Sequence, residues 1–207
     1  MRKNKIFNFC FLLFFTSCIS SYHAIQPSFS QYSESENKET GGLVITPGNE
    51  DVLFSNKVFQ RKALKKGIQL ISVKIENRSS EPVKLDYENF EVFNDFELVK
   101  LLTPTQVCSK IGYNMLGRSA IFALCIAGSF QISSAPTGLI NVYSPFLYSS
   151  PFSLFYLIRS AISNEKFKSD LESFGFGNRV IGPHETAYGI FSFKAEKVGE
   201  LLIRLKK

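Results

Sequence analysis

The fold is decided by the stretch Gln69-Leu70-Ile71-Ser72-Val73-Lys74-Ile75-Glu76-Asn77. In an extended chain, Ile71, Val73 and Ile75 point to one side and Ser72, Lys74 and Glu76 to the other. A period of two with one polar side is typical of a strand that covers a core. Turn-forming residues follow as far as Pro82, so the stretch predicts one strand of an antiparallel sheet.

Similar short segments lie on both sides of this strand. Outward from it, the alternation of apolar and polar residues predicts strands over 43–45, 83–87, 90–93, 97–102, 179–181, 188–195 and 201–205, with 58–64 as a further candidate. Regular spacing, with turn residues between the segments, predicts a mainly β fold, a β-sandwich of about seven or eight strands. The domain is expected to span 43–207 and to be interrupted by an insertion over 103–177.

The insertion is apolar and partly helical in character. Thr103 and Pro104 are a cap and a first helical residue, which predicts a helix through about Ile111. No charged residue lies between Arg118 and Arg159. Prolines break this region into runs shorter than the roughly 20 apolar residues that span a bilayer, so an apolar hairpin is expected.

Three alternatives remain open for this hairpin. It packs back on the sheet, or it lies in a membrane interface with Arg118 and Arg159 at the water boundary, or it forms a protein contact surface. In the second alternative, residues 119–162 bind membrane lipid.

A charged helix is expected to close the insertion. Asn164 is its predicted cap, Phe167 and Leu171 lie at helical spacing on its apolar face, and Lys168 and Glu172 form an i, i+4 pair.

The N-terminus has the features of an export signal. Three cations, Arg2, Lys3 and Lys5, precede a short apolar run that ends in Phe15-Thr16-Ser17-Cys18. This ending resembles the lipobox of bacterial lipoproteins, in which the cysteine thiol receives a diacylglycerol and the chain is cut just before it. The resemblance implies a signal peptide over 1–17 and lipidation of Cys18. The alternative is ordinary secretion with cleavage after Ser20.

The predicted anchor also suggests a location. Ile19 follows the cysteine where some inner-membrane lipoproteins carry Asp, which favours the outer membrane of a bacterial envelope. Residues 18–42 are rich in Ser, Gln, Glu and Asn, and they predict a flexible lipidated tether that spans about 25–30 Å.

Two cysteines remain in the mature domain, Cys108 and Cys125. In an oxidising compartment they are candidates for a disulfide. Two separate buried thiols are the equal alternative, because a free cysteine packs as a small hydrophobe.

A phrase near the C-terminus carries a second resemblance. Ile181-Gly182-Pro183-His184-Glu185-Thr186, followed by Tyr188-Gly189-Ile190-Phe191-Ser192-Phe193, resembles a strand–turn–strand signature of uncharacterised bacterial lipoproteins with an immunoglobulin-like domain. The resemblance covers roughly 67–205 and implies an immunoglobulin-like sandwich in the cell envelope. It departs from the family at His184, where glycine is usual, and in the prolines of the hairpin. It implies no catalytic residues.

No motif for catalysis, metal binding or a cofactor is found. His184 and Glu185 are adjacent in a turn and have no paired nucleophile, and the two cysteines lack metal-ligand spacing. The N-terminal signal carries half of the net charge of +6, so nucleic acid is not an expected partner. The sequence predicts a non-enzymatic envelope module whose partners are membrane lipid, through Cys18, and an unidentified envelope protein. An envelope enzyme with an unrecognised active site is the alternative from another class.

Overall fold

The structure is a computed structural model that describes residues 22–32, 38–40, 42–127, 132–134, 140–142 and 150–206. The described residues fall into two compact units. We call Tyr22–Gly112 with Glu165–Lys207 the sheet unit, and Tyr113–Asn164 the insertion unit. The predicted signal peptide (1–17) and Cys18 lie outside the described residues.

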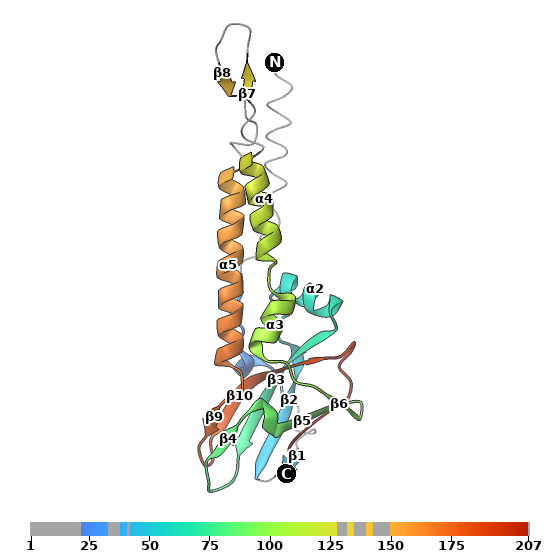
Figure 1. The fold of residues 1–207 in the computed structure, drawn as a ribbon. Helices are drawn as coiled ribbons and strands as arrows, with labels where there is room; N and C mark the ends of the chain where they lie inside the picture. Colours follow the sequence, from blue (N-terminus) through green and yellow to red (C-terminus); the bar gives the residue numbers. More distant parts are fainter. Residues whose placement is uncertain are drawn as a thin grey trace. The chain divides into compact units, whose positions relative to one another are not determined.

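The sheet unit contains antiparallel sheets (Figure 1). A four-stranded sheet has the order β1-β2-β3-β10, with the bounds Lys38–Thr40, Leu43–Asp51, Ile68–Asn77 and Thr186–Lys194. A three-stranded sheet has the order β11-β5-β6, with the bounds Leu201–Leu205, Phe90–Asn94 and Glu97–Val99. Strands β4 (Val83–Leu85) and β9 (Arg179–Ile181) pair separately.

Three helices contribute to the sheet unit, and a capping box fixes the start of one of them. The sheet unit holds α2 (Lys57–Lys65), α3 (Pro104–Ile111) and the last turns of α5 (Ser150–Ser173). The prediction for α3 is confirmed: Thr103 Oγ1 accepts from the Gln106 amide at 3.3 Å, and Gln106 Oε1 accepts from the Thr103 amide at 3.1 Å. This reciprocal pair satisfies two backbone donors that a helix start would otherwise leave unpaired.

One apolar core joins the sheets of this unit. It contains residues of β2, β3 and β10 from one sheet and of β5 and β11 from the other. At its centre, the Phe191 ring lies 5.0 Å from both the Phe90 and Phe176 rings, centroid to centroid. Gly189 is required beside this cluster, because a Cβ there would lie 2.2 Å from the Phe176 ring.

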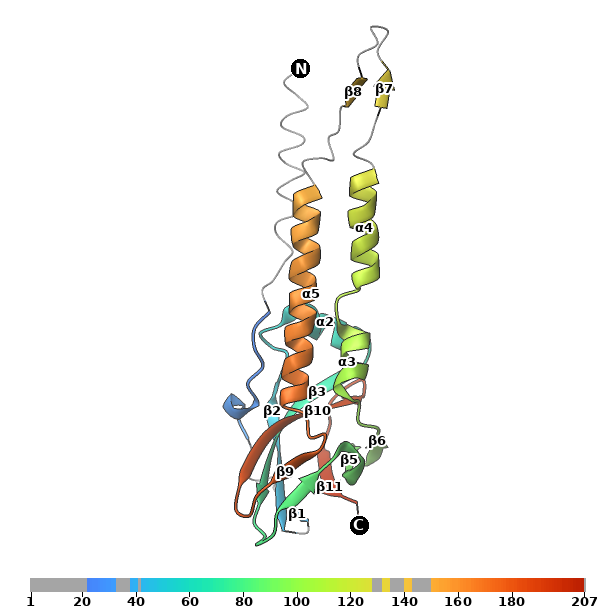
Figure 2. The same cartoon turned by 60° about the vertical axis from the view of Figure 1, so that its left-hand side comes forward.

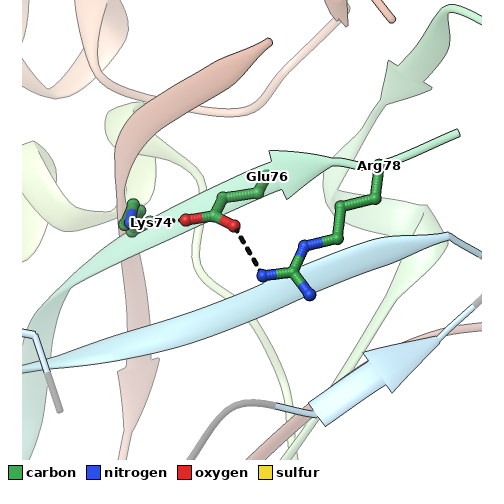
Figure 3. Close-up of polar contacts among 3 residues, drawn as sticks. All are labelled: Lys74, Glu76 and Arg78. Atoms are coloured by element: carbon green, nitrogen blue, oxygen red, sulfur yellow. Dashed lines mark hydrogen bonds and ion pairs between the residues drawn. The ribbon is translucent and has the colours of Figure 1, made fainter. Parts of the chain in front are cut away.

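Strand β3 follows the predicted alternation with one exception. Val73 and Ile75 are fully buried, and Lys74 and Glu76 are partly exposed on the other face. Glu76 forms ion pairs with Lys74 at 2.5 Å and with Arg78 at 3.1 Å (Figure 3). The hydrogen bond that Lys74 donates to the Glu76 carboxylate, together with that from Arg78, lowers the pKa of this carboxyl group. Ser72 differs from the expectation because it is buried.

Two predictions about secondary structure are wrong. Residues 58–64 lie in helix α2, with Phe59 and Ala63 buried one turn apart, and do not form a strand. A mainly β composition is also wrong, because helices and strands take up about equal shares of the described residues.

The prediction of a continuous flexible tether over 18–42 is also corrected. Strand β1 pairs with β2, and residues 22–32 form a strap on the sheet unit. Within the strap, Ile25 is buried and its amide donates to Asp170 Oδ2 at 2.9 Å. The Tyr22 hydroxyl donates to the same oxygen at 2.7 Å. The strap is therefore ordered, although the polar composition of residues 18–42 predicted a flexible segment.

Candidate functional site

The insertion unit exposes an apolar surface on α5. Its exposed apolar side chains follow helical spacing on one face of α5 (Ser150–Ser173). They are Leu154 (42% exposed), Phe155 (55%), Ile158 (50%) and Ile162 (46%). We call these four residues the apolar stripe. Contiguous exposed apolar surface of this kind is a candidate interaction site.

Helix α4 (Met115–Ala127) has an exposed apolar face of its own. Leu116 is 83% exposed, and Ala120 and Ala123 follow it at helical spacing and are also exposed. In both views α4 runs beside the first part of α5 (Figures 1 and 2). Strands β7 (Ile132–Ser134) and β8 (Ile140–Val142) pair in the same unit.

The opposite face of α5 is buried and polar. Ser160 and Ser163 are 1% and 4% exposed. Their hydroxyls donate to the carbonyls of Tyr156 at 2.6 Å and Arg159 at 2.8 Å, one turn earlier. This part of α5 thus reverses the usual pattern of a water-soluble helix, which buries apolar residues and exposes polar ones.

Arg118 of α4 contacts this polar face of α5. Its guanidinium carbon is 4.0 Å from the ring centroids of both Tyr113 and Tyr156, and the group donates to the Ser160 hydroxyl. Burial lowers the pKa of the guanidinium, and the two tyrosines oppose this shift. Arg118 therefore joins α4 to α5 through cation–π contacts. Arg159 has a looser contact, 5.8 Å from the Phe155 ring. Placement of either arginine at a membrane boundary stays a prediction.

A polar pair closes the unit where it meets the rest of the chain. The Tyr113 amide donates to Asn164 Oδ1 at 2.6 Å, and Asn164 Nδ2 donates to the Tyr113 carbonyl at 3.0 Å. Asn164 thus lies inside α5 and is not the helix cap that the sequence suggested. Among the described residues, none of the helices is both long enough and apolar enough to cross a membrane.

The cysteines are only partly described. Cys108 is a free, half-buried thiol on α3, whereas Cys18 and the side chain of Cys125 lie outside the described residues. Pairing of Cys108 with Cys125 thus stays a prediction, as does lipidation of Cys18. Burial, with a smaller contribution from the Glu172 carboxylate, raises the pKa of the Cys108 thiol to about 11.

The Cys108 thiol is expected to react slowly with iodoacetamide. In a Cys125→Ser chain at about pH 8, alkylation should be about 100-fold slower than that of free cysteine, because the thiolate is the nucleophile. The folded state favours the protonated Cys108 thiol over the thiolate. The stability that this preference contributes is fully present below about pH 9, the ordinary thiol pKa, and is lost as the pH rises through about 11. Mass spectrometry of the adduct measures the rate. Equal rates with and without denaturant would contradict a buried thiol.

The His184–Glu185 pair has a structural role in its turn. His184 has a positive φ of 56°, and the Glu185 carboxylate accepts from the Gly182 amide at 2.8 Å. Over the part of the chain that the structure describes, no group of at least three His, Cys, Asp or Glu residues is placed to hold a metal ion.

The sequence did not reveal that residues 22–32 form an ordered strap or that residues 57–65 form helix α2. The strap depends on Asp170 and Asn56, which are far from it in the chain. An asparagine just before an amphipathic stretch was the one local signal for α2.

Comparisons of the chain with protein-family models, with curated proteins and with solved structures found no match.

Proposed function

We propose that the chain is a lipid-anchored, non-enzymatic module of a bacterial cell envelope. Cys18 carries the lipid, and the apolar stripe on α5 contacts membrane lipid. The outer membrane is the proposed location. The antiparallel sheets with their shared core are proposed to correspond to an immunoglobulin-like sandwich, and that domain serves as the platform for the insertion.

The observation that carries this proposal is the reversed polarity of α5. Ser160 and Ser163 are buried with their hydroxyls bonded, while Ile158 and Ile162 are about half exposed. Burial of a whole aliphatic side chain contributes about 1.5–3 kcal/mol, so each half-exposed member of the stripe has about 1 kcal/mol to gain from lipid. Four such side chains give a surface that prefers an interface to water.

The lipid anchor strengthens such a contact without requiring more apolar surface. A single acyl chain holds a protein only marginally, whereas the two chains of a diacylglycerol on Cys18 would hold it firmly. Confinement by Cys18 raises the effective concentration of the stripe at the bilayer. A weak apolar surface then suffices for stable contact.

The proposal is tested with the mature chain, residues 18–207, carrying Cys18→Ala. This chain should still float with neutral phosphatidylcholine vesicles. Adding Ile158→Gln and Ile162→Gln should lower its partitioning by about 25-fold, about fivefold for each isoleucine replaced. Gln leaves the net charge unchanged. The lipidated wild type should resist carbonate extraction.

The matched control removes two exposed apolar side chains from the sheet unit. Leu98 is 63% and Val180 59% exposed, so Leu98→Gln with Val180→Gln deletes similar surface. Partitioning should then stay within about twofold of the parent. Equal losses in both double variants, or no binding by the Cys18→Ala chain, would refute a lipid-contacting stripe. Binding to an envelope protein that persists without lipid would assign the stripe to a protein partner.

A further inference from the structure

A second surface, on α2 of the sheet unit, is strongly basic. Five of the eleven residues from Asn56 to Lys66 are cationic, and no acidic residue occurs from 52 to 75. The cations are Lys57, Arg61, Lys62, Lys65 and Lys66. Positive charge is therefore concentrated on one short element, although the rest of the mature chain mixes its charges.

The basic residues share the outward face of α2 with large apolar side chains. Lys57, Arg61, Leu64 and Lys65 follow i, i+4, i+7, i+8 spacing, and all four are exposed. Leu64 is 60% exposed, and Phe54, just before the helix, is 67% exposed. Lys57 Nζ lies 3.9 Å from the centre of the Phe54 ring. We call Phe54, Lys57, Arg61, Leu64 and Lys65 the α2 surface.

The inward face of α2 holds this surface in place. Phe59 and Ala63 are buried, and the Phe59 ring lies 4.4 Å from that of Phe167 on α5. Lys62 Nζ donates to the Gly112 carbonyl at 2.6 Å. Among the residues that the structure describes, no ion pair involves Lys57, Arg61 or Lys65. Their charges are thus available to an external anion.

The strap places the α2 surface close to the proposed lipid. Asn56, at the start of α2, accepts from the His23 amide at 2.9 Å and donates to the His23 carbonyl at 2.8 Å. The Tyr22 ring meets Phe59 edge-on, with centroids 5.8 Å apart. From Cys18 to Tyr22 the chain reaches at most about 14 Å, at about 3.6 Å per residue.

We propose that the α2 surface binds the anionic headgroups of membrane phospholipids. The choice of a membrane as the source of these anionic groups rests on the proposed lipid anchor at Cys18. The charge and exposure of the α2 surface do not depend on that anchor. Exposed Phe and Leu among cations suit an interface that offers both phosphate and acyl chains. Nucleic acid offers no acyl layer for these side chains. Combined with the short anchor, the surface would orient the sheet unit with α2 against the bilayer.

Vesicle binding by the mature Cys18→Ala chain tests this proposal. Its partitioning should be about 100-fold stronger on vesicles that are one-third phosphatidylglycerol than on neutral phosphatidylcholine. Lys57→Gln, Arg61→Gln and Lys65→Gln together should remove this gain, because each cation near an anionic surface contributes about fivefold. The gain should also disappear between about 0.1 M and about 1 M salt, as the Debye length falls from about 10 Å to about 3 Å.

A triple variant elsewhere on the sheet unit is the matched control. Lys84, Lys197 and Lys206 are exposed, and their replacement by Gln changes the net charge equally but should leave most of the gain. Equal loss in both triple variants, or a gain that survives the α2 changes, would overturn the proposal. So would binding to duplex DNA with no preference for anionic vesicles. Failure of the apolar stripe would instead appear on neutral vesicles, where the α2 changes should have little effect.

Discussion

Replacement of Phe191 by alanine is expected to lower the free energy of unfolding by about 3–5 kcal/mol, a range typical of a buried aromatic residue. Phe191 lies in the middle of β10 and is fully buried. Its ring contacts Phe90 of β5 and Phe176, so it joins elements of both sheets. The cavity left by alanine would open the core where the sheets meet.

Urea unfolding followed by circular dichroism measures this change. Leu98→Ala is the control, because Leu98 is largely exposed on β6 and its replacement should alter the free energy by no more than about 0.5 kcal/mol. A Phe191→Ala protein as stable as wild type would show that the sheets do not share this core.

Replacement of Arg118 by methionine is the second change with a large expected effect. Methionine keeps an unbranched chain but removes the charge that lies between the Tyr113 and Tyr156 rings. The variant can form neither the two cation–π interactions nor the hydrogen bond to Ser160. We expect the opening free energy of the α4–α5 pair to fall by about 2–4 kcal/mol.

Hydrogen exchange of the α4 and α5 amides reports this opening separately from unfolding of the sheet unit. Arg159→Met is the control, because it removes the same charge from the same pair of helices. The Arg159 guanidinium lies 5.8 Å from the Phe155 ring, so its replacement should cost about 1 kcal/mol or less. Equal decreases in protection in the two variants would mean that the tyrosine rings do not hold the helices together.

The sequence predicted the elements whose determinants are local. Alternation along β3, the cap at Thr103 and the Lys168–Glu172 pair, 3.6 Å apart on α5, are each set by neighbours in the chain. Such patterns depend on backbone geometry alone, so they can be read without knowledge of the fold.

The missed elements depend on distant partners. Asp170 holds Ile25 and Tyr22 across about 145 residues of chain, so nothing in the strap itself distinguishes it from a solvated tether. Helix α2 was mistaken for a strand because Val58 and Leu64 are apolar but do not lie on its buried face.

Helix α5 is longer than its residues suggest. Pro151 is tolerated because it lies in the first turn, where its missing N–H has no helical acceptor to lose. Asn164 has a side chain that competes with helix formation in isolation, but here it binds the Tyr113 backbone. A tertiary contact therefore overrides the local signal for a break at Asn164, whereas Pro151 needs no such contact.

The most direct test of lipid contact by the apolar stripe is a depth measurement at position 158. A bimane label on Ile158→Cys is used in a mature chain that lacks Cys18, Cys108 and Cys125, with Val180→Cys as the reference site. On vesicles that contain brominated phosphatidylcholine, the label at 158 should lose most of its fluorescence and the label at 180 very little. Undiminished fluorescence at 158, together with ready quenching by aqueous iodide, would show that the stripe stays in water.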